Sequence, residues 1–203
     1  MYRAPTMEKQ GHHRRSIRLP GADYAEAGGY FITICTAQRK EIFGCIENGQ
    51  VSPTELGKIV RGCLVQIPNH FAHASISEYV VMPNHVHVII NLGVGARYIV
   101  PSPERPRSPE RFQKPVKGSI PTIIRTFKAA VVRQARKELG AQGTDIWQRN
   151  YFERVLRNGQ EYADASRYVA ENPMRWEWDA ENPRRTHETS EEGTMYRAPT
   201  KAG

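Results

Sequence analysis

The sequence predicts an α+β fold built on one antiparallel sheet of four strands. The main observation is the order of the elements, which runs strand, helix, strand, strand, helix, strand and ends with one further helix. The composition agrees, because 39% of the residues are hydrophobic and 25% are charged, as in globular domains. A chain of 203 residues is long enough for a full core, and we expect one domain rather than two.

The first strand and the first helix are predicted from contrasting patterns. The run "YFITICT" at 30–36 is β-branched and aromatic, which is typical of a strand. In "SPTELGKIVRGCLVQIP" at 52–68, apolar residues recur at steps of three and four, which predicts an amphipathic helix. Ser52 or Thr54 can cap the start of this helix, and Pro68 marks its end.

The second and third strands are predicted to form a hairpin. "ISEYVVM" at 76–82 and "HVHVIIN" at 85–91 are both strongly apolar, and Pro83 and Asn84 between them favour a turn. The segment that follows, 93–119, holds five prolines and six Lys or Arg residues. This composition indicates a flexible basic loop, because it cannot build a core.

A long helix, a fourth strand and a last helix complete the predicted order. The segment 121–139 has helical periodicity with Thr122 as a candidate cap, and 146–156 contains the fourth strand. The last helix, 159–172, begins after the capping residue Asn158. The apolar stripe of the long helix consists of Ile124, Phe127, Val131, Ala135 and Leu139. Together these elements follow the split βαβ pattern of the ferredoxin-like fold, with two helices on one face of the sheet.

The ends of the chain and its charge indicate where the protein acts. Residues 1–28 predict a basic flexible arm, 29–178 the domain, and 179–203 a polar tail. The net charge of +8 predicts an acidic partner, with nucleic acid ahead of an anionic membrane surface. The chain shows neither an apolar run of roughly 20 residues nor a signal-peptide pattern, and its three cysteines indicate reduced, buried thiols. We therefore expect a cytoplasmic, nucleoid-associated protein without a membrane segment.

Two histidines interrupt the most apolar stretch of the chain, "VVMPNHVHVII" at 80–90. Residues i and i+2 of a strand share a face, so His85 and His87 project together and Val86 points the other way. We expect the imidazoles on the face that the helices leave open. There they are spaced to hold one metal ion, although two polar residues on a solvated face give the same pattern. Mg²⁺ or Mn²⁺ would bind phosphate oxygens, whereas ligand softness alone favours Zn²⁺.

The last helix offers a nucleophile for such a site. At about 100° per residue, Tyr168 and Asn172 lie on adjacent turns of one flank, and Tyr162 belongs to the packing stripe. In this arrangement the phenol of Tyr168 can attack phosphorus while the amide oxygen of Asn172 joins the metal shell. A tyrosine that only packs against the sheet would show the same spacing.

Six segments resemble, in this order, the REP-associated tyrosine transposases, which are relatives of the single-tyrosine HUH transposases. The segments are "RRSIRLPGADY", "GGYFITICTAQRKEIFG", "YVVMPNHVHVII", "IIRTFKAAV", "IWQRNYFERVLRN" and "RYVAENP", and they span about residues 14 to 178. The resemblance implies that His85 and His87 bind Mg²⁺ or Mn²⁺, that Asn172 completes the metal shell and that Tyr168 is the nucleophile. It also implies cleavage of single-stranded, hairpin-bearing palindromic DNA through a 5′-phosphotyrosine, which leaves a free 3′-OH.

Basic residues are expected to bind the phosphates of this DNA. The expected contacts are Arg14, Arg15 and Arg18 on the arm, Arg125 and Lys128 on the long helix, and Arg149 near the fourth strand. Two other functions are compatible with the same patterns. One is a non-catalytic ferredoxin-like protein that binds single-stranded nucleic acid. The other is a metal-dependent hydrolase that uses water, with Tyr168 as a structural residue. A monomer is favoured and a dimer is the alternative.

Overall fold

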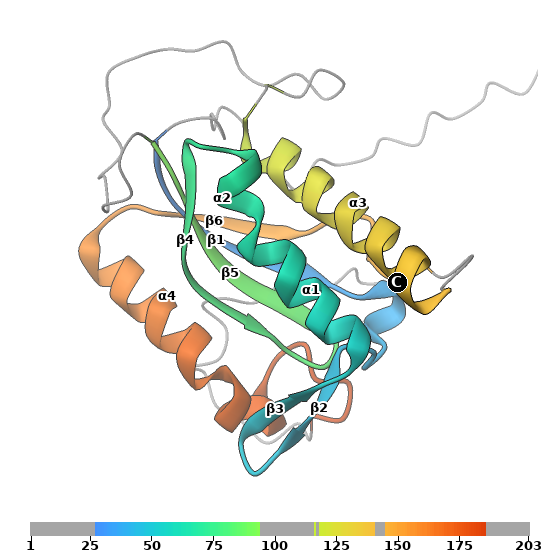
Figure 1. Cartoon of the computed structure of the whole chain (residues 1–203). Coiled ribbons are helices and arrows are strands. Elements are labelled where there is room, and N and C mark those ends of the chain that lie inside the picture. Colours follow the sequence, from blue (N-terminus) through green and yellow to red (C-terminus); the bar gives the residue numbers. More distant parts are fainter. Residues whose placement is uncertain (1–26, 94–115, 117, 141–144, 186–203) are drawn as a thin grey trace, which may run out of the picture.

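A four-stranded antiparallel sheet lies between helices that cover both of its faces (Figure 1). The computed structural model describes residues 27–93, 116, 118–140 and 145–185. The sheet has the strand order β4-β5-β1-β6, and every neighbouring pair is antiparallel. Its strands are β1 (Gly28–Cys35), β4 (Ala74–Val81), β5 (His85–Leu92) and β6 (Phe152–Leu156). The predicted α+β, ferredoxin-like arrangement is confirmed, with β1 and β5 as the central strands.

The remaining elements connect these strands or pack on them. The α-helices are α1 (Glu55–Val65), α2 (Ile67–His70), α3 (Ile120–Leu139) and α4 (Gly159–Glu171). Two 3₁₀ helices, η1 (Ala37–Arg39) and η2 (Asn172–Trp178), follow β1 and α4. A separate two-stranded hairpin is formed by β2 (Gly44–Glu47) and β3 (Gln50–Pro53). Within the described residues, no helix has both the length and the apolar character needed to cross a membrane.

Alternation along the strands divides the core into two parts. The larger part lies under α1 and α3, and its members from the central strands are Tyr30, Ile32, Ile34, Val86, Val88, Ile90 and Leu92. The smaller part lies under α4 and consists of Phe31, Ile89, Leu156, Ala165 and Val169. Figure 1 shows α4 on the opposite side of the sheet from α1 and α3. The expectation of an open second face is therefore wrong, because Ala165 and Val169 give α4 an apolar stripe that covers it.

The helix starts agree with the predicted caps in two cases of three. The hydroxyl oxygen of Thr54 accepts a hydrogen bond from the Gly57 amide at 3.1 Å, and Asn158 Oδ1 accepts one from the Glu161 amide at 2.9 Å. Helix α3 instead begins after Ser119, and the predicted cap Thr122 lies in its first turn. The capping position is therefore three residues earlier than predicted. The Thr122 hydroxyl donates to the Val116 carbonyl at 2.9 Å instead of capping the helix.

Three further details differ from the sequence predictions. Leu139, assigned to the buried stripe of α3, is the last residue of the helix and is 44% exposed. Cys35 is buried as expected, but Cys63 is half-buried and Cys45 is exposed on the β2–β3 hairpin. The hairpin itself was not predicted, although Asn48 and Gly49 at its turn both have positive φ, as a type I′ turn requires.

Candidate active site

The register between β1 and β5 positions the two histidines. Thr33 lies opposite His87, and Cys35 lies opposite His85. His85 is fully buried and His87 is 1% exposed, and their ring centroids are 4.3 Å apart. The two imidazoles project to the same side of the sheet, as the i, i+2 spacing predicts, but they lie in the protein interior rather than on a solvated surface.

Each imidazole has one engaged ring nitrogen and one without a partner. His85 Nδ1 lies 2.8 Å from Asn84 Oδ1, and His87 Nδ1 lies 2.9 Å from Thr33 Oγ1. The two Nε2 atoms are buried and have no hydrogen-bond partner in the described part of the chain. Burial lowers the pKa of both histidines, and the neighbouring His85 lowers that of His87 further. Two neutral rings therefore present unpartnered nitrogens, which is a costly arrangement unless a ligand binds there.

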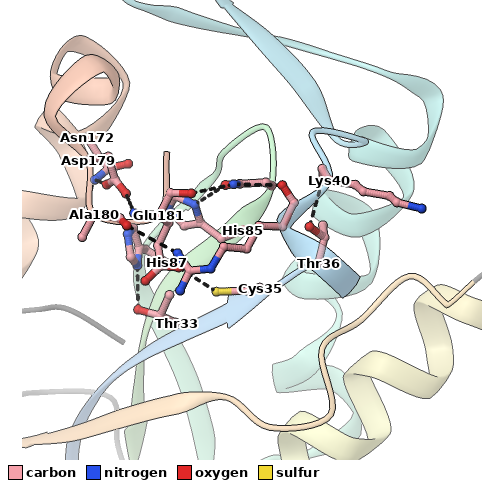
Figure 2. Close-up of polar contacts among 12 residues, drawn as sticks. Thr33, Cys35, Thr36, Lys40, His85, His87, Asn172, Asp179, Ala180 and Glu181 are labelled. Atoms are coloured by element: carbon pink, nitrogen blue, oxygen red, sulfur yellow. Dashed lines mark hydrogen bonds and ion pairs between the residues drawn. The ribbon is translucent and has the colours of Figure 1, made fainter. Parts of the chain in front are cut away.

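The carboxylate of Asp179 completes this cluster. One of its oxygens and one ring nitrogen each of His85 and His87 all lie within 4.8 Å of one another. Figure 2 shows Asp179 beside the His87 ring, at the side where Asn172 lies. Burial acts to raise the pKa of Asp179, but the two histidines and two hydrogen bonds outweigh it and lower the pKa. The group is therefore a charged carboxylate that faces the two imidazoles.

Tyr168 and Asn172, both predicted as site residues, lie beside this carboxylate. The Tyr168 hydroxyl donates to Asp179 Oδ2 at 3.3 Å, and Asn172 Nδ2 donates to the same oxygen at 2.6 Å. The Tyr168 ring packs edge-on against His87, with 5.1 Å between the ring centroids. Burial, and then the charge of Asp179, raises the pKa of Tyr168, so the side chain is a neutral phenol. Asn172 Oδ1 is buried and lacks a hydrogen-bond partner among the residues described.

The segment that carries Asp179 is held in place by buried polar contacts. The sequence predicts a polar tail from residue 179, and its first residues are polar, yet Asp179 and Glu181 are only 5% and 2% exposed. The Glu181 carboxylate forms an ion pair with Arg39, and its backbone amide donates to Asp179 Oδ1 at 2.6 Å. The Glu181 carbonyl accepts a hydrogen bond from Asn84 Nδ2 at 2.7 Å. Polar composition did not mean exposure here, because each charged group has a partner.

The donor atoms fit a divalent cation. The orphaned Nε2 atoms of His85 and His87, together with the Asp179 carboxylate, form a set of two nitrogens and one oxygen that leaves coordination positions open. Imidazole ligands favour Zn²⁺ or other transition metals, whereas the carboxylate also suits Mg²⁺ and Mn²⁺. Asn172 was the predicted third ligand; its Nδ2 contacts Asp179, and its Oδ1 has no hydrogen-bond partner among the described residues.

The predicted DNA contacts have different environments. Arg125 and Arg149 are exposed, whereas Arg14, Arg15 and Arg18 lie outside the described residues. Lys128 is partly buried, and its Nζ donates to the Gln148 carbonyl at 2.8 Å and to the Asn150 carbonyl at 2.9 Å. Burial lowers the pKa of Lys128 to about 8. Its position favours a structural role, in which it joins α3 to the segment before β6, over the expected contact with a phosphate.

A shallow, open hollow of about 600 Å³ lies along α3 beside Trp147, and three of its six lining residues are basic. Its lining residues are Lys128, Ala129, Val132, Arg133, Arg136 and Trp147. Thr36, directly after β1, forms a β-bridge with Trp147, and the preceding residue Cys35 pairs with His85. The hollow and the histidine cluster are therefore at the same end of the sheet but on opposite faces, the hollow on the α3 side and the histidines on the α4 side.

These features define a class of protein: a ferredoxin-like domain with a histidine pair on a central strand, facing a tyrosine on a helix that covers the sheet. No model of a known protein family matches the chain. The chain is 40% identical over 168 residues to an uncharacterised protein of Haemophilus influenzae strain Rd. The aligned region covers 83% of this chain and 92% of that protein. The chain therefore belongs to the same family as the Haemophilus influenzae protein.

Two solved structures are similar to this one. The structure of a REP-associated tyrosine transposase bound to a REP hairpin has a TM-score of 0.51 and 19% identity, covering 77% of this chain and 73% of that chain. A transposase candidate from Deinococcus radiodurans R1 has a TM-score of 0.42 and 15% identity, covering 75% of this chain and 96% of that chain. The first likeness confirms at the level of the fold the resemblance that the sequence motifs indicate.

Proposed function

We propose that this protein is a transposase-like DNA strand transferase of the REP-associated type, with Tyr168 as the nucleophile. The observation that carries the proposal is the convergence on Asp179: the Tyr168 hydroxyl donates to its carboxylate, and the histidine nitrogens lie within 4.8 Å of it. A packing tyrosine needs no such neighbours. The cluster is also what a purely nucleic-acid-binding sheet would lack, because binding by stacking uses exposed aromatics rather than a buried, charged cluster.

In this mechanism the phenol oxygen of Tyr168 attacks the phosphorus of one phosphodiester. The bond from Tyr168 oxygen to phosphorus forms as the bond from phosphorus to the 3′ oxygen breaks, which leaves a 5′-phosphotyrosine and a 3′-OH. Asp179 Oδ2 accepts the hydrogen bond of the phenol, so it is placed to take the phenolic proton as attack proceeds and to release it, so that the departing 3′ oxygen becomes the 3′-OH. A second 3′-OH can reverse the step by attacking the phosphotyrosine and displacing the Tyr168 oxygen, which then regains its proton.

His85, His87 and Asp179 would hold a divalent cation, Mg²⁺ or Mn²⁺, in this site. When bound, such an ion supplies positive charge that polarises the phosphate and offsets the charge of the transition state. Asn172 holds the Asp179 carboxylate by the hydrogen bond from Nδ2, and the Tyr168 ring is held against His87. Asp179 is buried and Tyr168 is half-buried, which limits the water beside the phenol and favours attack by the side chain over hydrolysis.

The proposed substrate is single-stranded DNA that carries a hairpin formed by an imperfect palindrome. The net charge of +8 favours a polyanion, and the structure of similar fold contains a REP hairpin. The hollow beside Trp147 lies at the same end of the sheet as the histidines but on the opposite face, so it would bind a part of the DNA away from the phosphate that reacts. The proposal does not require a second copy of the chain.

Denaturing gel electrophoresis of the protein mixed with Mn²⁺ and a labelled hairpin oligonucleotide tests this proposal. We expect a covalent protein–DNA adduct with the wild type and none with Tyr168→Phe, because only the attacking oxygen is removed. Tyr162→Phe is the matched control on the same helix, since its hydroxyl contacts Ser77 and Asn91 rather than Asp179.

The same gel distinguishes the alternatives. Free cut ends without an adduct would indicate a hydrolase that uses water. DNA that stays intact on this gel but is retarded by the protein on a native gel would indicate a nucleic-acid binder. An adduct that persists in Tyr168→Phe would contradict the assignment of the nucleophile and direct attention to Tyr162 or Tyr151.

A further inference from the structure

Asn84 lies in the turn between β4 and β5, and its side-chain amide is fully buried and fully engaged. Its Nδ2 donates to the Glu181 carbonyl at 2.7 Å and to the Arg39 carbonyl at 3.3 Å. Its Oδ1 lies 2.8 Å from Nδ1 of His85. One side chain therefore joins the histidine, η1 and the segment that carries Asp179.

These partners leave the amide only one orientation. The backbone carbonyls of Glu181 and Arg39 can only accept hydrogen bonds, so the part of the Asn84 amide that faces them must be the NH₂. A flipped amide would place its oxygen against two carbonyl oxygens and would lose both hydrogen bonds. The group that faces His85 is therefore the amide oxygen, which can only accept.

The orientation of Asn84 determines where His85 carries its proton. A neutral imidazole has one N–H, and the contact with an acceptor places it on Nδ1. Nε2 then has a free lone pair, and this atom is the buried one without a partner. The contact between Thr33 and His87 has no such consequence, since a hydroxyl can either donate to Nδ1 or accept from it.

We infer that Asn84 is a positioning residue that fixes His85 as the Nδ1–H tautomer, so that its Nε2 lone pair is directed at the cation site before any cation binds. This inference rests on the proposed function, because a directed lone pair matters only if the site takes a metal ion. Residues that orient a ligand histidine in this way typically change metal affinity by about 10–100-fold when they are replaced.

Nuclear magnetic resonance of the metal-free, chelator-treated protein tests the tautomer directly. Long-range ¹H–¹⁵N correlation spectra distinguish a protonated ring nitrogen from an unprotonated one, at a pH above the range in which imidazole protonates. We expect the Nδ1–H pattern for His85 in the wild type. An Nε2–H pattern would overturn the inference, whatever the protein does with metal or DNA.

Two substitutions separate the acceptor of Asn84 from its donors. Asn84→Asp keeps an oxygen opposite His85 but cannot donate to Glu181 and Arg39, whereas Asn84→Ala loses both functions. We expect Asn84→Asp to keep the Nδ1–H pattern for His85, and the tautomer is its readout because its second oxygen faces the carbonyls of Glu181 and Arg39 and destabilises this turn. Asn84→Ala should give mixed tautomers and lower the Mn²⁺ affinity by roughly 10–100-fold. An unchanged Nδ1–H pattern in Asn84→Ala would overturn the inference, because the acceptor would then not determine the tautomer.

Thr36→Val is the matched control for local destabilisation. Thr36 is as buried as Asn84, and its hydroxyl donates to the Lys40 carbonyl at 2.8 Å without contacting a histidine. We expect the tautomer and the Mn²⁺ affinity to be unchanged in this variant, and a loss equal to that of Asn84→Ala would overturn the inference. A wild type with the Nδ1–H pattern but no Mn²⁺ binding would support the tautomer assignment and contradict the proposed function.

Discussion

Asp179 is the residue on which most contacts of the site converge. Its Oδ2 accepts hydrogen bonds from Tyr168 and Asn172, and its Oδ1 accepts one from the Glu181 amide. A buried carboxylate with this many donors remains charged, which its lowered pKa reflects. It therefore supplies the negative charge that two neutral imidazoles cannot, and a cation site needs such a charge.

The third protein ligand can be identified by comparing two substitutions. If Asp179 binds the cation, Asp179→Asn should lower the Mn²⁺ affinity by at least about 10-fold, because a charged ligand oxygen is lost. Asn172→Ala should then have the smaller effect, since it removes only a hydrogen bond to the carboxylate. Titration of Mn²⁺ followed by electron paramagnetic resonance measures both. Glu177→Gln, an exposed acid on η2, is the control, and a reversed order would restore Asn172 as the ligand.

The buried histidines should make the metal-free protein sensitive to acid. Burial lowers the pKa of His85 and His87 below the ordinary value of 6.5. Below that pH the unfolded chain takes up protons that the folded protein does not bind, so the free energy of unfolding falls as the pH decreases. Urea unfolding in chelator from about pH 8 to about pH 5 measures this slope. His87→Gln should flatten it, and an unchanged slope would contradict the burial of an uncharged His87.

At the scale of elements, helix α1 packs against the segment before β2 through a glycine. A Cβ atom on Gly57 would lie 2.0 Å from the carbonyl oxygen of Phe43, whereas one on Gly62 in the same helix would meet nothing within 4 Å. Phe43 is itself fully buried, so neither side can move easily. The close approach of α1 thus depends on one residue without a side chain.

The two glycines of α1 should respond to alanine in opposite directions. Gly57→Ala should lower the free energy of unfolding by about 1–3 kcal/mol or more, because the added methyl group overpacks the contact with Phe43. Gly62→Ala should raise it by about 0.5–1 kcal/mol, because alanine is the better helix former at an open position. Urea unfolding of both variants measures the difference. A stabilising Gly57→Ala would contradict the packing of α1 described above.

Helices and strands with a clear hydrophobic pattern could be predicted from the sequence, whereas the short β2–β3 hairpin was not. The strands β1 and β5 were predicted from their β-branched and apolar runs, and Thr54 and Asn158 marked the starts of α1 and α4. The β2–β3 hairpin was missed because its strands have only four residues each, although Asn48-Gly49 is a strong turn signal.

At the scale of the whole molecule, the site is assembled from segments far apart in the sequence, which limits what sequence can predict. The i, i+2 and i, i+4 rules placed His85 with His87 and Tyr168 near Asn172, because both pairs are local. Asp179 follows the last recognisable motif, and nothing local in the sequence indicates that a charged residue there turns back to the sheet. Only its tertiary partners, such as the ion pair between Arg39 and Glu181, determine this.

We expect the positive charge of the protein to bind DNA mainly through one surface, the hollow on α3, rather than equally through all of its basic residues. Arg133 and Arg136 line the hollow on α3, at the end of the sheet where the histidines lie. Each phosphate that a basic side chain neutralises contributes about 0.7 to the salt slope of binding on single strands and about 0.9 on duplex DNA. Replacing both arginines with glutamine should therefore weaken binding of a hairpin oligonucleotide and flatten its salt dependence by about one to two units.

Fluorescence anisotropy of a labelled hairpin at several salt concentrations measures this slope for the Arg133→Gln, Arg136→Gln double variant. The control is Lys58→Gln with Arg61→Gln on α1, which removes the same charge from a helix that does not line the hollow. We expect the control to keep most of the slope, because exposed charges farther than about 10 Å from the DNA are largely screened at ordinary salt. Equal losses in the two double variants would mean that the net charge attracts DNA without a preferred surface. In that case the hollow beside Trp147 would have no role of its own in binding.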